Sequence, residues 1–234
     1  AVTCVQTCAL PISPELNQSV RYFPLVGIIV GASAALSLEL ANALLPLPVA
    51  VIISMMTTIL ITGGFHEDGL ADALDGLGGG WSREQILMIM KDSRLGSYGA
   101  LGLVLALLLK FQTLSALNVL LLPAVLITGH SLSRLAAVWV IATQTYVRET
   151  GKAKPLAHSI TASELWLANI SGCAPLLLLP FKFWPALIAV GGMWLYFSHI
   201  LRRNLNGYTG DCLGAMQQLC ELTFYLGVLA CSSI

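Results

Sequence analysis

Charged side chains are scarce in this sequence. Only 10% of the 234 residues are Asp, Glu, Lys or Arg, whereas 56% are hydrophobic and the mean hydropathy is +0.80. This composition lies well outside the range of ordinary globular domains and predicts an integral membrane protein. The formal net charge is zero, so the composition gives no argument for nucleic-acid binding, and we expect no nucleic acid as a partner.

The cysteines show no paired metal-ligand spacing apart from Cys4 and Cys8. These two belong to the opening stretch AVTCVQTCALPI, which is neither a signal peptide nor a membrane span. Because the stretch resembles a translated sequencing-library adapter, we expect residues 1–12 to be a non-native extension. No internal repeat divides residues 13–234, which we expect to form one integral-membrane domain.

Hydrophobic runs, by contrast, are long and closely spaced. A membrane span needs roughly 20 apolar residues, and the candidate segments are 24–45, 47–65, 98–117, 119–143, 164–180, 183–201 and 212–230. Their spacing leaves room for one helical bundle and no separate soluble domain. The sequence therefore predicts an all-α fold, a polytopic transmembrane bundle of about seven spans.

Basic residues are distributed unevenly between the two sides of these predicted spans. Lys110 and Lys182 fall near one side and Arg134 falls inside a span. The rest of the 12 basic residues fall on the other side, which the positive-inside rule identifies as cytoplasmic; they are Arg21, Arg83, Lys91, Arg94, Arg148, Lys152, Lys154, Arg202 and Arg203.

The longest charged region follows the second predicted span, and its later half reads SREQILMIMKDSR. Ile86, Ile89 and Met90 recur there at helical spacing, with the charged residues at other positions. This pattern predicts an amphipathic helix at the membrane interface. Ser82 is expected to cap its N-terminus.

The stretch GGFHEDGLADALDGLGGG, residues 63–80, concentrates carboxylates directly after an uncharged run. In a helix, Asp68, Asp72 and Asp75 lie within roughly 60° of one face. Because no basic residue of the stretch is at pairing distance, the carboxylates need a cation, and oxygen ligands favour Mg²⁺ or Mn²⁺. Glu67 points elsewhere and is a further candidate ligand. The alternative is a solvated acidic start of a helix, since negative charge is favoured there.

Cationic groups follow in KDSRLGSYG, where Lys91 and Arg94 flank Asp92. Lys and Arg side chains are suited to binding phosphate, although these two also fit the basic flank of the third predicted span. Asp211, in GYTGDCLGA, lies on the same predicted side at the start of a helix. N-capping explains Asp211 on its own, and a role in the site is the alternative.

Three ionisable residues fall inside predicted spans: Glu39, Arg134 and Glu221. Such residues are costly in a membrane and are functional candidates for that reason. Arg134 follows His130 by four residues, so both lie on one helix face. The alternative is an internal hydrogen bond or ion pair between helices, which we favour for Glu39 and weigh equally for Arg134.

The motifs GGFHEDGLADALDG, MKDSRLGSYG and NGYTGDCLGA together resemble the cobalamin synthase family, also called adenosylcobinamide-GDP ribazoletransferases. The resemblance extends from RYFPLVG to LCEL. It implies a multi-pass transferase of the bacterial inner membrane that requires Mg²⁺ and has its active site on the cytoplasmic side. Such an enzyme joins adenosylcobinamide-GDP to α-ribazole, or its 5′-phosphate, and releases GMP. Membrane lipid is an expected partner, and the oligomeric state, a homo-oligomer included, is left open.

Carried over by position, the family motifs fall on His66, Asp68, Asp72, Asp75, Asp92, Arg94, Gly210 and Asp211. Residues and resemblance together give three expected groups. Catalytic residues are Asp75, Asp92 and His66; metal ligands are Glu67, Asp68, Asp72 and Asp75; substrate and phosphate ligands are Lys91, Arg94, Arg134 and Asp211.

Two other functions compete with this interpretation. The segment DALDG resembles the opening of the CDP-alcohol phosphotransferase motif, but that motif continues with an Ala-Arg pair and two further aspartates that are missing here. An ion-coupled transporter would place its coupling residues near the membrane midplane, whereas this chain gathers its acids at one predicted boundary.

Overall fold

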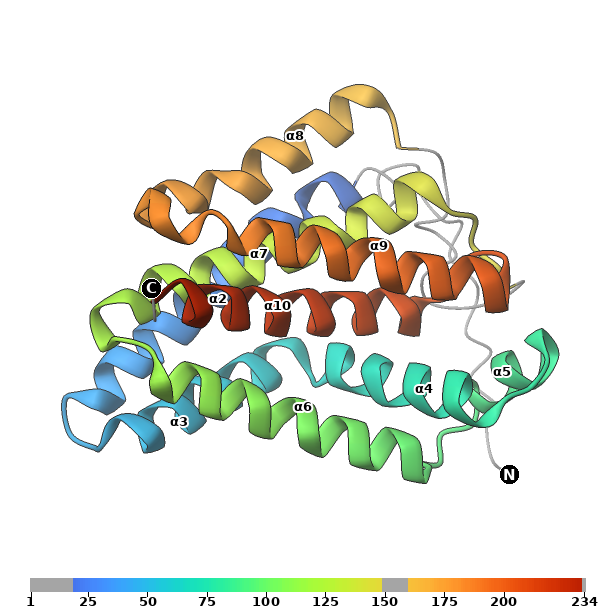
Figure 1. The fold of residues 1–234 in the computed structure, drawn as a ribbon, viewed down its shortest axis with the longest axis horizontal. Coiled ribbons are helices and arrows are strands. Elements are labelled where there is room, and N and C mark those ends of the chain that lie inside the picture. The colour runs from blue at the N-terminus through green and yellow to red at the C-terminus, as the bar shows by residue number, and fades with distance from the viewer. Residues whose placement is uncertain (1–18, 149–159, 233–234) are drawn as a thin grey trace, which may run out of the picture.

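The computed structural model describes residues 19–148 and 160–232, and these form helices joined by short turns (Figure 1). The prediction of an all-α fold is therefore confirmed for the described residues. The α-helices are α2 (Phe23–Asn42), α3 (Leu47–Thr62), α4 (Phe65–Gly79), α5 (Arg83–Ile89), α6 (Ser97–Ala116), α7 (Leu122–Thr143), α8 (Ala162–Cys173), α9 (Ala186–Leu205) and α10 (Gly210–Ser232). Short 3-10 turns at Ser19–Tyr22, Val119–Leu121, Ala174–Leu178 and Phe181–Phe183 precede or follow these helices.

The prediction of about seven membrane spans is not confirmed. In the described part of the chain, 4 helical segments are long and apolar enough to cross a membrane, or 5 if α3 and α4 count as one broken span. The expected span at 164–180 is not one helix, because α8 has 12 residues and rises only about 18 Å. The helix α10 has 23 residues, but Gln217, Gln218 and Glu221 interrupt its apolar sequence.

The predicted span at 47–65 is wrong at its end. The helix α3 ends at Thr62, and the chain bends by 88° before α4 begins at Phe65. Gly63 and Gly64 both have φ of 68°, a left-handed conformation that glycine adopts without steric cost. This glycine pair therefore turns the acidic segment into a separate helix.

At the centre of the bundle, α7 packs along α2 and α10, while α4 lies between α6 and α10 (Figure 1). The α2–α7 contact is close because α2 presents glycines to it. A Cβ atom at Gly31 would lie 2.6 Å from the Cα atom of Ile127. Small residues that let helix backbones approach are typical of packing inside membranes.

Large apolar side chains cover the outside of the bundle. Ile29 on α2, Leu105 on α6 and Ile188 on α9 are 65%, 65% and 79% exposed. Water would not favour so much exposed apolar surface, whereas lipid tails cover it without cost. The structure therefore agrees with the membrane protein that the composition predicts.

The predicted amphipathic helix forms as α5. The Ser82 hydroxyl accepts a hydrogen bond from the Gln85 backbone N–H at 3.3 Å, which confirms the expected N-cap. Ile86 and Met90 are buried, and they pack where Gly76 of α4 leaves room for the Met90 side chain. Ile86 of α5 and Met90, which directly follows α5, therefore pack at the end of α4. The placement of this helix at a membrane interface stays a prediction.

Candidate active site

Three carboxylates gather where α4 meets the start of α10, and we call Asp68, Asp72 and Asp211 the carboxylate cluster. Asp68 is exposed, and Asp72 and Asp211 are half-buried. Asp72 lies within electrostatic range of both other members. The helices can approach this closely because Gly69 faces α10: a Cβ atom there would lie 2.9 Å from the Asp211 carbonyl oxygen.

Arg148 is the basic residue of this cluster. Its Nη2 atom lies 2.7 Å from Oδ2 of Asp211. A short parallel pairing holds the segment in place, because the Tyr208 N–H donates to the Thr145 carbonyl and the Val147 N–H donates to the Tyr208 carbonyl, both at 3.0 Å. The sequence showed Arg148 only as one member of a basic flank, so it was not predicted as a site residue.

N-capping by Asp211 is not observed. The residue that caps α10 is Thr209, whose hydroxyl accepts a hydrogen bond from the Cys212 backbone N–H at 3.3 Å. Asp211 follows in the first turn and pairs with Arg148 instead. Burial raises the pKa of the Asp211 carboxyl, and the Arg148 guanidinium opposes that rise.

Asp75 lies on the same side of α4 as Asp68 and Asp72, as the helical spacing predicts, but it is buried and bound to α6. Its Oδ2 atom accepts a hydrogen bond from the Gly96 N–H at 2.7 Å, and Oδ1 accepts one from the Gly99 N–H at 2.8 Å. Asp75 therefore caps the N-terminus of α6, which has no cap from its own side chains. Its expected roles as metal ligand and catalytic group stay predictions.

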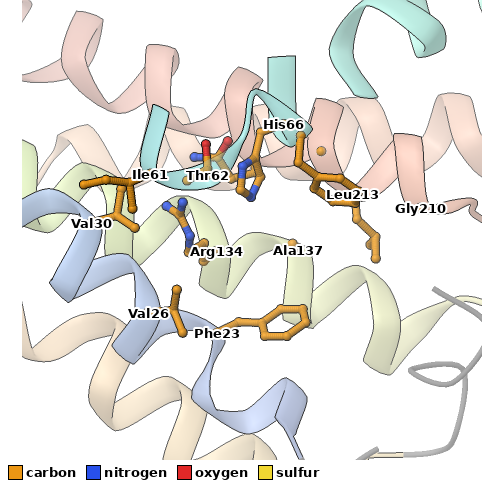
Figure 2. Close-up of a pocket in the computed structure, with 13 residues that line it drawn as sticks. Phe23, Val26, Val30, Ile61, Thr62, His66, Arg134, Ala137, Gly210 and Leu213 are labelled. Carbon is orange, nitrogen blue, oxygen red and sulfur yellow. The ribbon is translucent and has the colours of Figure 1, made fainter. Parts of the chain in front are cut away.

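His66 and Arg134 line a cavity of about 370 Å³ beside the carboxylate cluster (Figure 2). The cavity is partly open to the outside of the bundle, because exposed Val26 and Phe65 belong to its lining. The cavity lies among α2, the α3–α4 bend, α7 and the start of α10, and most of its lining is apolar. Arg134 is 5% exposed, and its Nη1 atom donates to the His130 carbonyl at 3.0 Å. Figure 2 shows His66 and Arg134 reaching into the cavity from opposite helices.

Glu67 points away from the carboxylate cluster, as the spacing predicts. Its Oε1 atom accepts a hydrogen bond from Gln218 Nε2 at 3.0 Å, so its nearest partner lies on α10. Gln217 and Gln218 are buried polar residues that the sequence analysis did not single out. Two adjacent amide side chains within an otherwise apolar stretch are the sequence feature that indicates buried polar contacts here.

Glu221 is fully buried between three helices. It forms an ion pair with Lys110 of α6, lies 3.1 Å from His130 Nδ1 of α7, and accepts a hydrogen bond from the Tyr225 hydroxyl at 3.1 Å. Of the two interpretations of Glu221, the internal ion pair is the one that the structure shows. The placement of Lys110 near one side of the predicted spans stays a prediction; the structure adds that its ammonium is buried in this ion pair. Glu39, for which an internal partner was favoured, is exposed near the end of α2.

The loop after α5 carries Lys91, Asp92 and Arg94 on the outside of the protein. Arg94 Nη2 lies 2.6 Å from Oδ2 of Asp92, and the Arg94 side chain is 87% exposed. Hydrogen bonds from Arg94 lower the pKa of the Asp92 carboxyl. The side chains of Asp92 and Arg94 contact each other, and no described contact joins either of them to the carboxylate cluster.

The carboxylate cluster has the donor chemistry that Mg²⁺ prefers. In the described part of the chain, no three His, Cys, Asp or Glu side chains converge closely enough to enclose a metal ion. Mg²⁺ rarely needs such a cage, because one or two carboxylates together with water and substrate phosphates usually hold it. Exposed Asp68 and half-buried Asp72 fit this mode of binding.

Comparisons with known proteins agree with the motif resemblance. A family model described as cobalamin-5-phosphate synthase matches residues 3–229. The chain belongs to this family. A relative from Shewanella oneidensis named adenosylcobinamide-GDP ribazoletransferase is 46% identical over 226 residues, 94% of this chain and 86% of the relative. Equally named relatives from Shewanella woodyi and Shewanella halifaxensis are 47% and 48% identical, covering 93% and 92% of this chain and 87% and 85% of their own.

No solved structure matches the chain. The family match confirms the resemblance drawn from the motifs. The assignment of single residues to roles stays a prediction, as does the expectation for residues 1–12, which lie outside the described residues.

Proposed function

We propose that the protein joins adenosylcobinamide-GDP to α-ribazole, or its 5′-phosphate, with release of GMP. The observation that supports this most directly is the carboxylate cluster at the α4–α10 contact, with Arg148 beside it, in a chain closely related to ribazoletransferases. Carboxylates and a guanidinium are what a reaction at a pyrophosphate needs, because charge on the phosphate oxygens must be neutralised.

Asp68 and Asp72 would hold Mg²⁺, with Mn²⁺ as the substitute. The bound ion would neutralise charge on the pyrophosphate of the corrinoid substrate. A ribose hydroxyl of the nucleoside attacks the phosphorus attached to the corrinoid, the new O–P bond forms, and the bond to the departing GMP breaks. A carboxylate of the cluster accepts the hydroxyl proton. Arg148 contributes a permanent positive charge for the phosphates.

We further propose that the cluster faces the cytoplasmic side of a bacterial inner membrane. The end of α9, the start of α10 and α5 lie at the same end of the bundle (Figure 1). Arg202 and Arg203 occupy the last turn of α9. Positive charge at this end supports the orientation by the positive-inside rule.

The test is GMP release by the purified protein incubated with Mg²⁺, adenosylcobinamide-GDP and α-ribazole. We expect GMP release that EDTA abolishes and added Mg²⁺ restores. Asp72→Asn should lower the rate at least 100-fold, as expected for loss of a group that binds charge in the transition state. The matched control is Glu84→Gln, which removes an exposed carboxylate on α5, outside the cluster.

Two results would contradict the proposal. One is full activity in Asp72→Asn, which would remove the cluster from the site. The other is CMP release from a CDP-alcohol with no GMP release, which would support the phospholipid alternative. The transporter alternative has no support from Glu39 and Glu221, because one is exposed and the other is enclosed by ion pairs.

A further inference from the structure

The partly open cavity next to the carboxylate cluster is lined by both apolar and polar side chains. Phe23, Val30 and Leu213 contribute apolar surface, and the polar lining residues are Thr62, His66, Arg134 and Gln217. A volume of about 370 Å³ is near the lower end of the ~300–1,000 Å³ typical of small-molecule sites. Such a cavity accommodates a nucleoside base and is too small for a corrin macrocycle.

The cavity and the cluster are neighbours on both helices that form them. On α4, His66 lines the cavity and Asp68 belongs to the cluster. On α10, Gly210 and Gly214 line the cavity, and Asp211 lies between them in the sequence. A molecule that places one end in the cavity can therefore direct its other end to the carboxylates.

We propose that the cavity receives the flat, largely apolar aromatic base of ribazole, with its ribose directed toward the carboxylate cluster. This inference rests on the proposed function and adds where the nucleoside binds. Guanine is a weaker candidate, because its many polar edges need more hydrogen-bond partners than mainly apolar walls supply. The phosphate groups are also poor candidates for this cavity, because among the described lining residues only Arg134 is a cation.

Arg134 provides the polar contact to this base. Its guanidinium has five N–H donors, and the bond from Nη1 to the His130 carbonyl leaves others for a ligand. The base of ribazole has one ring nitrogen that is not bonded to ribose, and this nitrogen accepts a hydrogen bond. A mainly apolar pocket in which a buried guanidinium offers a fixed donor is suited to such a base.

The first experiment fills the cavity. Ala137 on α7 lines it, and Ala137→Leu adds an isopropyl group into empty space, so the fold should tolerate it. We expect calorimetric affinity for α-ribazole, measured without the corrinoid substrate, to fall at least tenfold. The KM for adenosylcobinamide-GDP should change less than twofold. The matched control is Ala142→Leu, on the same helix at an exposed position, which should leave both values unchanged.

The second experiment varies the ligand. Each buried methyl group adds about fourfold to binding, so the nucleoside that lacks the two methyl groups of the ribazole base should bind about 15-fold more weakly. A nucleoside with C–H in place of the free ring nitrogen should bind at least tenfold more weakly to the unsubstituted protein. In Arg134→Met, whose side chain has no hydrogen-bond donor, this difference should disappear.

Other outcomes would overturn the inference. If Ala137→Leu raises only the KM for adenosylcobinamide-GDP, the cavity binds the other substrate. If native mass spectrometry finds a lipid that Ala137→Leu displaces while α-ribazole affinity is unchanged, the occupant is an acyl chain. Absence of GMP release would refute the proposed function alone, because α-ribazole binding that Ala137→Leu abolishes would still locate the nucleoside in this cavity.

Discussion

Asp75 offers the sharpest test of the structure, because the sequence predicts a catalytic carboxylate there and the structure shows a helix cap. In Asp75→Ala, the N–H groups of Gly96 and Gly99 lose their acceptors. Hydrogen bonds to a charged group contribute about 1.5–3 kcal/mol each. Gly99 is buried and loses its bond outright, whereas half-buried Gly96 regains part of its bond from water. The free energy of unfolding should therefore fall by roughly 2–4 kcal/mol.

The measurement is reversible unfolding in mixed micelles, combined with hydrogen exchange of the Gly96 and Gly99 amides. A loss of about 2 kcal/mol in the free energy of opening corresponds to amide exchange about 30-fold faster. The faster exchange should be confined to the start of α6. Asp68→Ala is the matched control, because it removes an exposed carboxylate from the same side of α4. Its unfolding free energy should change by no more than about 0.5 kcal/mol.

Equal stability of Asp75→Ala and Asp68→Ala would refute the capping argument. Asp75→Asn separates the two roles. It keeps one acceptor oxygen but turns an amide NH₂ toward a backbone donor, so we expect it to be destabilised as well. If Asp75→Asn is as stable as the unsubstituted protein and still fails to release GMP, Asp75 acts on the substrate.

Three further predictions concern the bundle itself. Glu221→Gln leaves the buried Lys110 ammonium without its carboxylate and should destabilise the protein by about 3–5 kcal/mol in micelle unfolding. The double variant Glu221→Gln/Lys110→Met should regain most of this stability. If it regains none, the broken ion pair is not the cause of the loss. Gly63→Ala places a side chain at φ of 68° with open space around it and should cost about 1–2 kcal/mol through backbone strain, whereas Gly191→Ala in α9, also in open space, should be neutral or stabilising. Gly69→Val should push α4 from α10 and reduce GMP release at least tenfold, with far-UV circular dichroism unchanged; normal activity would separate the cluster from this helix contact.

Local sequence patterns were enough to predict the helical fold, the shared face of the acidic residues and one helix cap. Apolar composition gave the helical membrane fold, and the spacing of Asp68, Asp72 and Asp75 placed them on one side of a helix, as observed. Ser82 was identified as a cap because its hydrogen bond reaches only to Gln85, within one turn. Each of these features depends on neighbours a few residues away, so the sequence contains what is needed to predict them. Motif resemblance added the family, which the comparisons confirm.

Only the tertiary structure showed that the candidate site residues lie in different surroundings. Asp75 is bound to α6, His66 faces a cavity with Arg134, and Asp211 pairs with Arg148, and every one of these contacts joins separate helices or loops. The sequence also did not show that Gly63 and Gly64 would break a span, because an apolar run with two glycines can continue as a helix or bend. Helical periodicity states which residues share a face. Which neighbouring helix that face meets depends on how the whole bundle packs, and that packing separated one acidic motif into a cap, a cavity wall and a carboxylate cluster.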